Sequence, residues 1–199
     1  MFEHRNVIMM KDKVMPFIHV FTAIFALLFV HFIFYSTESI LAYTIGIIIV
    51  RYIFKYGKIQ NDKVRKSVPY TQHRNAFLLG GAIMAGAIIL TTIWSGINPI
   101  MHAYRVTPLP KMFYIVILAP IGEEVIYRQL LYKDAFTHPW VGRLVSGSLF
   151  VAIHTPTTLY SLVFYIMATI ALFVAYEKSG NNLWVAIALH IANNAFAFM

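Results

Sequence analysis

The stretch APIGEEVIYRQLLY, from Ala119 to Tyr132, places two adjacent glutamates and an arginine inside a run of apolar residues. The whole chain is 59% hydrophobic and only 12% charged, so these charges are unusual in their surroundings. An ionisable side chain at the centre of a membrane-spanning helix costs about 2.5–3.5 kcal/mol on insertion scales, and such residues mark functional positions. Three of them in one apolar stretch indicate a site inside the membrane.

Apolar segments of membrane-spanning length recur along all 199 residues. A bilayer core about 30 Å thick needs about 20 apolar residues per helix, so the pattern predicts an all-α, polytopic transmembrane helical bundle. The first segment is longer than the core of a signal peptide, and we expect it to be retained. About seven spans are predicted, at 14–35, 39–55, 75–94, 111–133, 140–154, 158–177 and 183–199.

Lysine and arginine divide the connections between these spans into two sets. Six of them lie in the 55–74 connection, whereas the connections 36–38 and 155–157 have none. Because rich and poor connections alternate along the chain, the positive-inside rule predicts that the N-terminus lies inside. The net charge of +8 is then a topology signal, and no motif indicates nucleic-acid binding. The basic 55–74 connection can also attract anionic membrane lipid.

Glu124 and Arg128 are four residues apart and therefore lie on the same helix face, which predicts an ion pair. Glu123 points about 100° away from Glu124 and lacks that partner. It is the better candidate for a proton-accepting group. Pro120 removes a backbone hydrogen bond and can kink the helix beside Glu123. A purely structural ion pair between helices is the competing interpretation of Glu124 and Arg128.

Two further predicted spans carry histidines with a partner one turn away. His154 follows Phe150 on the fifth span, and His190 precedes Asn194 on the seventh. Each pair shares a helix face because its members are four residues apart. A single histidine in an apolar helix is more often a packing residue, but these two accompany a carboxylate and an amide on separate helices.

Glutamate, histidine and asparagine in a dry cavity suit the hydrolysis of a peptide bond by activated water. A carboxylate can take a proton from water, a histidine can hold that water, and an amide and a second imidazole can donate to an oxyanion. No cysteine is present, which excludes a cysteine nucleophile and disulfides. Zinc held by Glu123, His154 and His190 is the alternative, since three protein ligands and an open position form a catalytic zinc site.

These motifs resemble those of the CPBP family, the CAAX-protease and bacteriocin-processing group also called Abi. The family pattern E-E-x-x-x-R, F-x-x-x-H and H-x-x-x-N/D is read here as Glu123-Glu124-Val-Ile-Tyr-Arg128, Phe150-Val-Ala-Ile-His154 and His190-Ile-Ala-Asn-Asn194. The resemblance covers 111–199, which we expect to be the catalytic helices. Residues 1–110 would add N-terminal transmembrane helices and a basic cytoplasmic loop to the same bundled domain.

The resemblance implies a glutamic-type intramembrane endopeptidase without a cofactor. By this implication Glu123 is the general base, His154 assists the water, His190 and Asn194 form the oxyanion hole, and Arg128 pairs with Glu124 to set the site. The partners implied are a peptide or membrane-protein substrate and membrane lipid. Bacterial relatives act in peptide maturation or bacteriocin self-immunity, and the small size and lack of cysteine favour a bacterial plasma membrane.

Two other functions remain open at the level of the sequence. A non-catalytic membrane immunity or regulatory binding protein would keep its function when Glu123 is replaced by alanine. A proton-coupled transporter could use the same buried glutamate and histidines. We find no internal repeat of the kind that many transporter folds contain.

Overall fold

The computed structural model describes residues 25, 48, 68–96 and 109–198 of the chain. Every regular element within these residues is a helix, which confirms the predicted all-α class for this part of the protein. The predicted spans 14–35 and 39–55 lie outside it, apart from Phe25 and Ile48, which are helical. The count of seven spans and the division at residue 110 stay predictions.

The helices of the C-terminal part follow the predicted spans closely. One unbroken helical segment from Leu109 to Asp134 replaces the predicted span 111–133, and the three helices after it begin and end within three residues of their predicted bounds. In order they are α3 Tyr70–Ser95, α4 Leu109–Phe113, η2 Tyr114–Leu118, α5 Ala119–Glu124, η3 Val125–Asp134, α6 Pro139–Ile153, α7 Leu159–Lys178 and α8 Leu183–Phe196, of which η2 and η3 are π-helices.

Helix α3 begins at Tyr70, five residues before the predicted start of the third span at residue 75. The prediction followed hydropathy, which marks where the apolar part of a helix begins and not where the helix itself begins. Polar contacts hold the extra turn in place. Gln72 Nε2 donates to the carbonyl oxygen of Lys178 at 2.9 Å, and His73 Nε2 lies 3.3 Å from Asn182 Nδ2.

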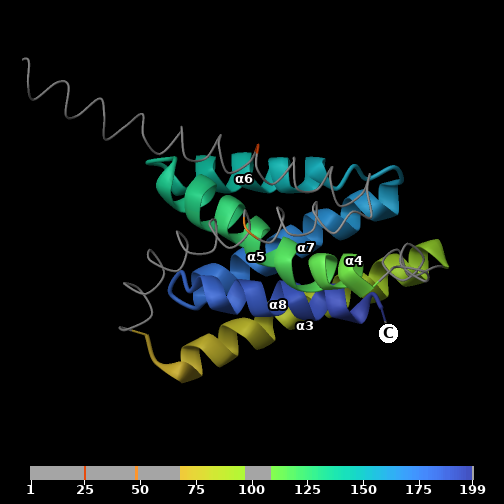
Figure 1. Cartoon of the computed structure of the whole chain (residues 1–199), viewed down its shortest axis with the longest axis horizontal. Helices are drawn as coiled ribbons and strands as arrows, with labels where there is room; N and C mark the ends of the chain where they lie inside the picture. Colours follow the sequence, from red (N-terminus) through yellow and green to blue (C-terminus); the bar gives the residue numbers. More distant parts are fainter. Residues whose placement is uncertain (1–24, 26–47, 49–67, 97–108, 199) are drawn as a thin grey trace, which may run out of the picture.

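Helix α7 lies between α3 and α6, with α8 beside it (Figure 1). Gly80 lets α3 approach α7 closely, because a Cβ at this position would lie 2.9 Å from the carbonyl oxygen of Ala171. Two helices among the described residues, α3 and α7, are long and apolar enough to cross a membrane, and α6 and α8 are shorter apolar helices. Their outer faces carry large exposed apolar side chains, including Ile93, Leu144 and Ile170.

The helix ends that the charge pattern places inside lie together at one end of the bundle. Gln72 in the first turn of α3 bonds to Lys178 at the end of α7. Arg143 in the first turns of α6 forms an ion pair with Glu177, also near the end of α7. Neighbouring helices therefore run in the alternating directions that the topology requires. Which side of the membrane this end faces stays a prediction.

Candidate active site

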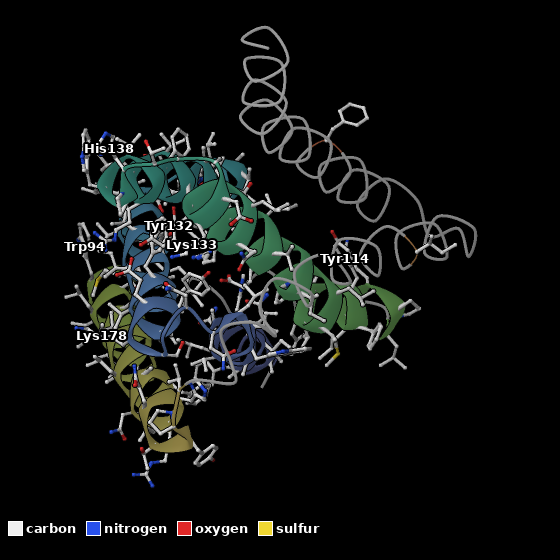
Figure 2. The ribbon with its side chains drawn as sticks, turned by 90° about the vertical axis from the view of Figure 1, so that its left-hand side faces the viewer. Trp94, Tyr114, Tyr132, Lys133, His138 and Lys178 are labelled. Carbon is white, nitrogen blue, oxygen red and sulfur yellow. The ribbon has the colours of Figure 1, made fainter. Side chains whose placement is uncertain are left out.

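The segment that carries the two glutamates changes its helical winding around them. Pro120 opens α5, and a proline ring clashes with the carbonyl of the residue four positions earlier. That residue is Val116, in the π-helical turn η2, where the wider winding accommodates the ring. Tyr114 marks the η2 end of this segment in Figure 2, and His138 lies just beyond its other end. Such π-helical turns are frequent at functional sites.

The winding widens again directly after Glu124, in the ten residues of η3. Hydrogen bonds from neighbouring helices hold this unusual winding. Ser146 on α6 donates its hydroxyl hydrogen to the carbonyl oxygen of Tyr127, and the Tyr176 hydroxyl on α7 donates to Gln129 Oε1 at 3.2 Å. The position of η3 against α6 and α7 is therefore set by specific polar contacts as well as by packing.

Glu124 is fully buried and joins two helices through two contacts of one oxygen. Its Oε1 lies 3.0 Å from Arg128 Nη1, so the predicted pair between these residues is present. The same oxygen accepts a hydrogen bond from His190 Nδ1 on α8 at 2.8 Å. Because a carboxylate can only accept, His190 carries its proton on Nδ1.

Glu123 faces the other nitrogen of the same imidazole. Its Oε2 lies 3.8 Å from His190 Nε2, which is longer than a hydrogen bond. Oε2 is buried and has no hydrogen-bond partner among the residues that the structure describes. A buried polar atom of this kind normally has a partner, so Glu123 Oε2 is the atom of the cluster that is available to a small polar molecule such as water.

The Phe150 ring connects the charged cluster to the second histidine. The guanidinium carbon of Arg128 lies 4.4 Å from the centre of this ring and 5.1 Å from that of Phe173. The ring centres of His190 and His154 lie 5.8 Å and 4.7 Å from that of Phe150. Phe150 thus packs against the arginine and against both imidazoles.

His154 ends α6, and its ring is held from its own helix. Its Nδ1 lies 2.7 Å from the carbonyl oxygen of Phe150, which accepts the hydrogen bond. The Tyr165 ring of α7 lies 4.5 Å from the His154 ring, centre to centre. With Nδ1 donating, Nε2 is the atom through which a neutral His154 can accept a proton.

Asn194 follows His190 by one helical turn and ties α8 to the π-helical turn η2. Its Nδ2 donates to the carbonyl oxygen of Ile115 at 2.9 Å, and its Oδ1 accepts from Asn193 Nδ2 at 3.2 Å. An amide group has two N–H donors. One hydrogen of Asn194 is therefore used to hold η2, and the other is available to a ligand.

Some of the predicted site residues are in direct contact, and others lie near them without touching them. Glu123, Glu124, Arg128 and His190 form a connected cluster, and His154 joins it through Phe150. Asn194 lies one turn along α8 and contacts backbone. Sequence reasoning missed Ser146, Phe173 and Tyr165, whose side chains hold the cluster from α6 and α7 and belong to no motif.

The zinc alternative requires Glu123, His154 and His190 to reach one ion. Within the described part of the chain, no group of three His, Cys, Asp or Glu side chains is arranged to hold a metal ion. The geometry therefore does not support a zinc site built from these three residues.

These features define a class: a helical bundle of the membrane type whose interior holds two carboxylates, a guanidinium and an imidazole in contact. Residues 105–196 match the family described as "Type II CAAX prenyl endopeptidase Rce1-like". The match agrees with the resemblance to the CPBP family of CAAX proteases that the three motifs indicate in this C-terminal part of the chain. No curated protein and no solved structure matches the chain.

Proposed function

We propose that this protein is a glutamic-type intramembrane endopeptidase, which hydrolyses a peptide bond in a peptide or membrane-protein substrate. One observation carries the proposal: the buried run from Arg128 through Glu124 and His190 to Glu123, which ends at an oxygen without a hydrogen-bond partner among the described residues. A structural ion pair needs only the first two members. The second carboxylate and the imidazole between them are what hydrolysis by water requires.

In this mechanism Glu123 takes a proton from a water molecule, and the resulting hydroxide attacks the carbonyl carbon of the substrate. The carbonyl π electrons move to oxygen and form a tetrahedral oxyanion. When the oxyanion collapses, the C–N bond breaks and the leaving amine takes up the proton that Glu123 removed from water, either directly from Glu123 or through Nε2 of His154. A positioned general base contributes about 10²- to 10⁴-fold to such a rate.

The proposed oxyanion role of His190 sets a requirement on its protonation. Nδ1 already donates to Glu124, so Nε2 can donate to an oxyanion only when the ring carries both protons. Glu124 Oε1 lies against Nδ1 of His190 and against Nη1 of Arg128, so the carboxylate holds the ring in place for this role.

Asn194 would supply the second donor to the oxyanion through the hydrogen that does not bond to Ile115. His154 would hold the attacking water through Nε2, since its Nδ1 is committed to the Phe150 carbonyl. We propose a multi-pass protein of a bacterial plasma membrane, acting in peptide maturation or bacteriocin self-immunity.

The proposal is tested by comparing membrane peptides, by mass spectrometry, in cells that produce the wild-type protein or Glu123→Gln. Glutamine keeps the shape of the side chain and cannot act as the base, so peptides released by the wild type should be missing from the variant. Glu177→Gln is the matched control, because it removes a partly exposed carboxylate on α7 outside the cluster. Peptide profiles that are the same for all three proteins would contradict the proposal and favour a non-catalytic membrane protein.

A further inference from the structure

His154 follows Ile153, the last residue of α6, so no further turn of this helix packs beside its side chain. Its peptide N–H bonds to the carbonyl of Val151, and the next residue, Thr155, has a positive φ of 44°. Pro156 follows, and a residue before proline is disfavoured in the helical conformation. The contacts of the side chain itself then decide how well its orientation is kept.

Two aromatic side chains and one carbonyl provide these contacts. The Phe150 carbonyl accepts from Nδ1 at 2.7 Å, and the Phe150 ring lies 4.7 Å from the imidazole, centre to centre. Both contacts come from α6 itself. The Tyr165 ring comes from α7, and its centre lies 4.5 Å from that of the imidazole, with the two planes tilted by 35°.

Tyr165 differs from Phe150 in what else it contacts. Phe150 also packs against Arg128 and His190, so replacing it would disturb the whole cluster. Tyr165 packs against Phe164 of its own helix and against His154. It lies in the second turn of α7, directly after the short connection 154–158 that joins the two helices. The ring contact between Tyr165 and His154 includes none of the buried ions, so a change at Tyr165 tests that contact more directly than a change at Phe150 does.

We propose that Tyr165 is a positioning residue for His154: its ring holds the imidazole plane so that Nε2 keeps a constant direction toward the reacting water. The inference rests on the proposed peptidase function for its consequence in catalysis, and on the 4.5 Å contact between the two rings for the positioning itself. The role is assigned to the ring, because the ring makes the contact with His154. A phenylalanine therefore serves as well as the tyrosine, and a leucine does not.

The experiment compares the wild type with Tyr165→Phe and Tyr165→Leu in two measurements. The first is kcat and KM for a peptide that the wild type cleaves. Tyr165→Phe should stay within about twofold of the wild type, whereas Tyr165→Leu should lower kcat about ten- to a hundredfold and leave KM nearly unchanged, as expected for a misplaced catalytic group. Tyr160→Leu, at the start of the same helix, is the matched control and should keep both values.

The second measurement is the ¹⁵N and ¹H spectrum of the histidine rings in the purified full-length protein, with His154 assigned from the spectrum of His154→Asn. The wild type and Tyr165→Phe should show His154 as one tautomer with the proton on Nδ1. Tyr165→Leu should show averaging between the two tautomers. This measurement needs no substrate, so it tests the positioning even if the protein cleaves no peptide.

An unchanged His154 spectrum in a folded Tyr165→Leu protein would overturn the proposal. A Tyr165→Phe protein as impaired as Tyr165→Leu would overturn it as well, because the hydroxyl would then be the active part. Failure of the peptidase function has a different signature: neither the wild type nor any variant cleaves a peptide, while the histidine spectra still separate leucine from phenylalanine.

Discussion

The described part of the molecule contains two ion pairs between an arginine and a glutamate, in opposite surroundings. Arg143 and Glu177 join α6 to α7 with the better geometry: Nε–Oε1 is 2.6 Å and Nη2–Oε2 is 2.9 Å, with the two side chains 48% and 28% exposed. Arg128 and Glu124 make one contact of 3.0 Å, and both side chains are 0% exposed.

The comparison shows that good geometry in an ion pair does not by itself mean that losing the pair would strongly destabilise the protein. Water and headgroups can replace either partner of the exposed pair, so such pairs contribute about 0–1 kcal/mol. Nothing can replace a partner of the buried pair, and removing one leaves an uncompensated charge. Burying ions is a poor way to gain stability, so the buried pair is better explained by what it holds: His190 against Glu124, facing Glu123.

The largest expected effect on stability comes from Arg128→Met. Methionine fills the space between Phe150 and Phe173 but leaves Glu124 buried without its cation. We expect the free energy of unfolding to fall by about 3–5 kcal/mol. Unfolding in mixed micelles with increasing SDS measures this. A loss below about 1 kcal/mol would mean that the two pairs are equivalent.

Two glycines allow a similar comparison, between the buried contact of α6 with η3 and the exposed face of α3. A Cβ on Gly142 would lie 2.6 Å from the carbonyl oxygen of Tyr132, where α6 meets η3, so Gly142→Ala forces the helices apart. We expect a loss of about 1–3 kcal/mol by overpacking. A Cβ on Gly86 meets no atom within 4 Å. Gly86→Ala should therefore be neutral or stabilising by up to about 1 kcal/mol in the same unfolding assay. Equal losses from both substitutions would contradict the packing described.

The exposed pair should show a small coupling. A double-mutant cycle with Arg143→Ala, Glu177→Ala and the double variant should give a coupling energy of about 0.2–1 kcal/mol, which falls as salt is added. Cleavage activity should not change in any of the three. A coupling as large as that of a buried pair would show that this end of the bundle is shielded from water.

The smallest expected effect is that of a chelator. If Glu123 and not a metal ion activates the water, incubation with EDTA or 1,10-phenanthroline should leave cleavage within about twofold of the untreated rate, because the rate then depends on the base alone. Activity that is lost on chelation and restored by zinc would favour the alternative of a metal held by Glu123, His154 and His190.

Much of the fold of the described residues could be predicted because hydropathy and helical periodicity carry it. The bounds of α6, α7 and α8 and the pairing of Glu124 with Arg128 follow from spacing alone. The start of α3 was wrong by five residues, because Tyr70–Arg74 is helical and polar at once. The predicted spans 14–35 and 39–55 lie outside the described residues.

The rest of the site depends on information that no local pattern contains. The π-helical winding of η2 and η3 alters which residues share a face, and it has no signature in composition. Ser146 contacts Tyr127, 19 positions away, and Tyr165 contacts His154, 11 positions away. Each contact depends on how one helix is rotated about its axis relative to its neighbour, which the sequence does not show. Motifs locate the chemical groups, and only packing between helices locates the residues that support them.

The central claim is that Glu123 activates the water that cleaves the peptide bond. The most direct test is the rate at which purified protein, in proteoliposomes, cleaves one defined peptide, measured for the wild type and for Glu123→Gln at equal folded concentration. The account predicts a loss of at least about 10²-fold for Glu123→Gln, with unfolding in SDS unchanged within about 1 kcal/mol. Cleavage by the folded Glu123→Gln protein at the wild-type rate would contradict it.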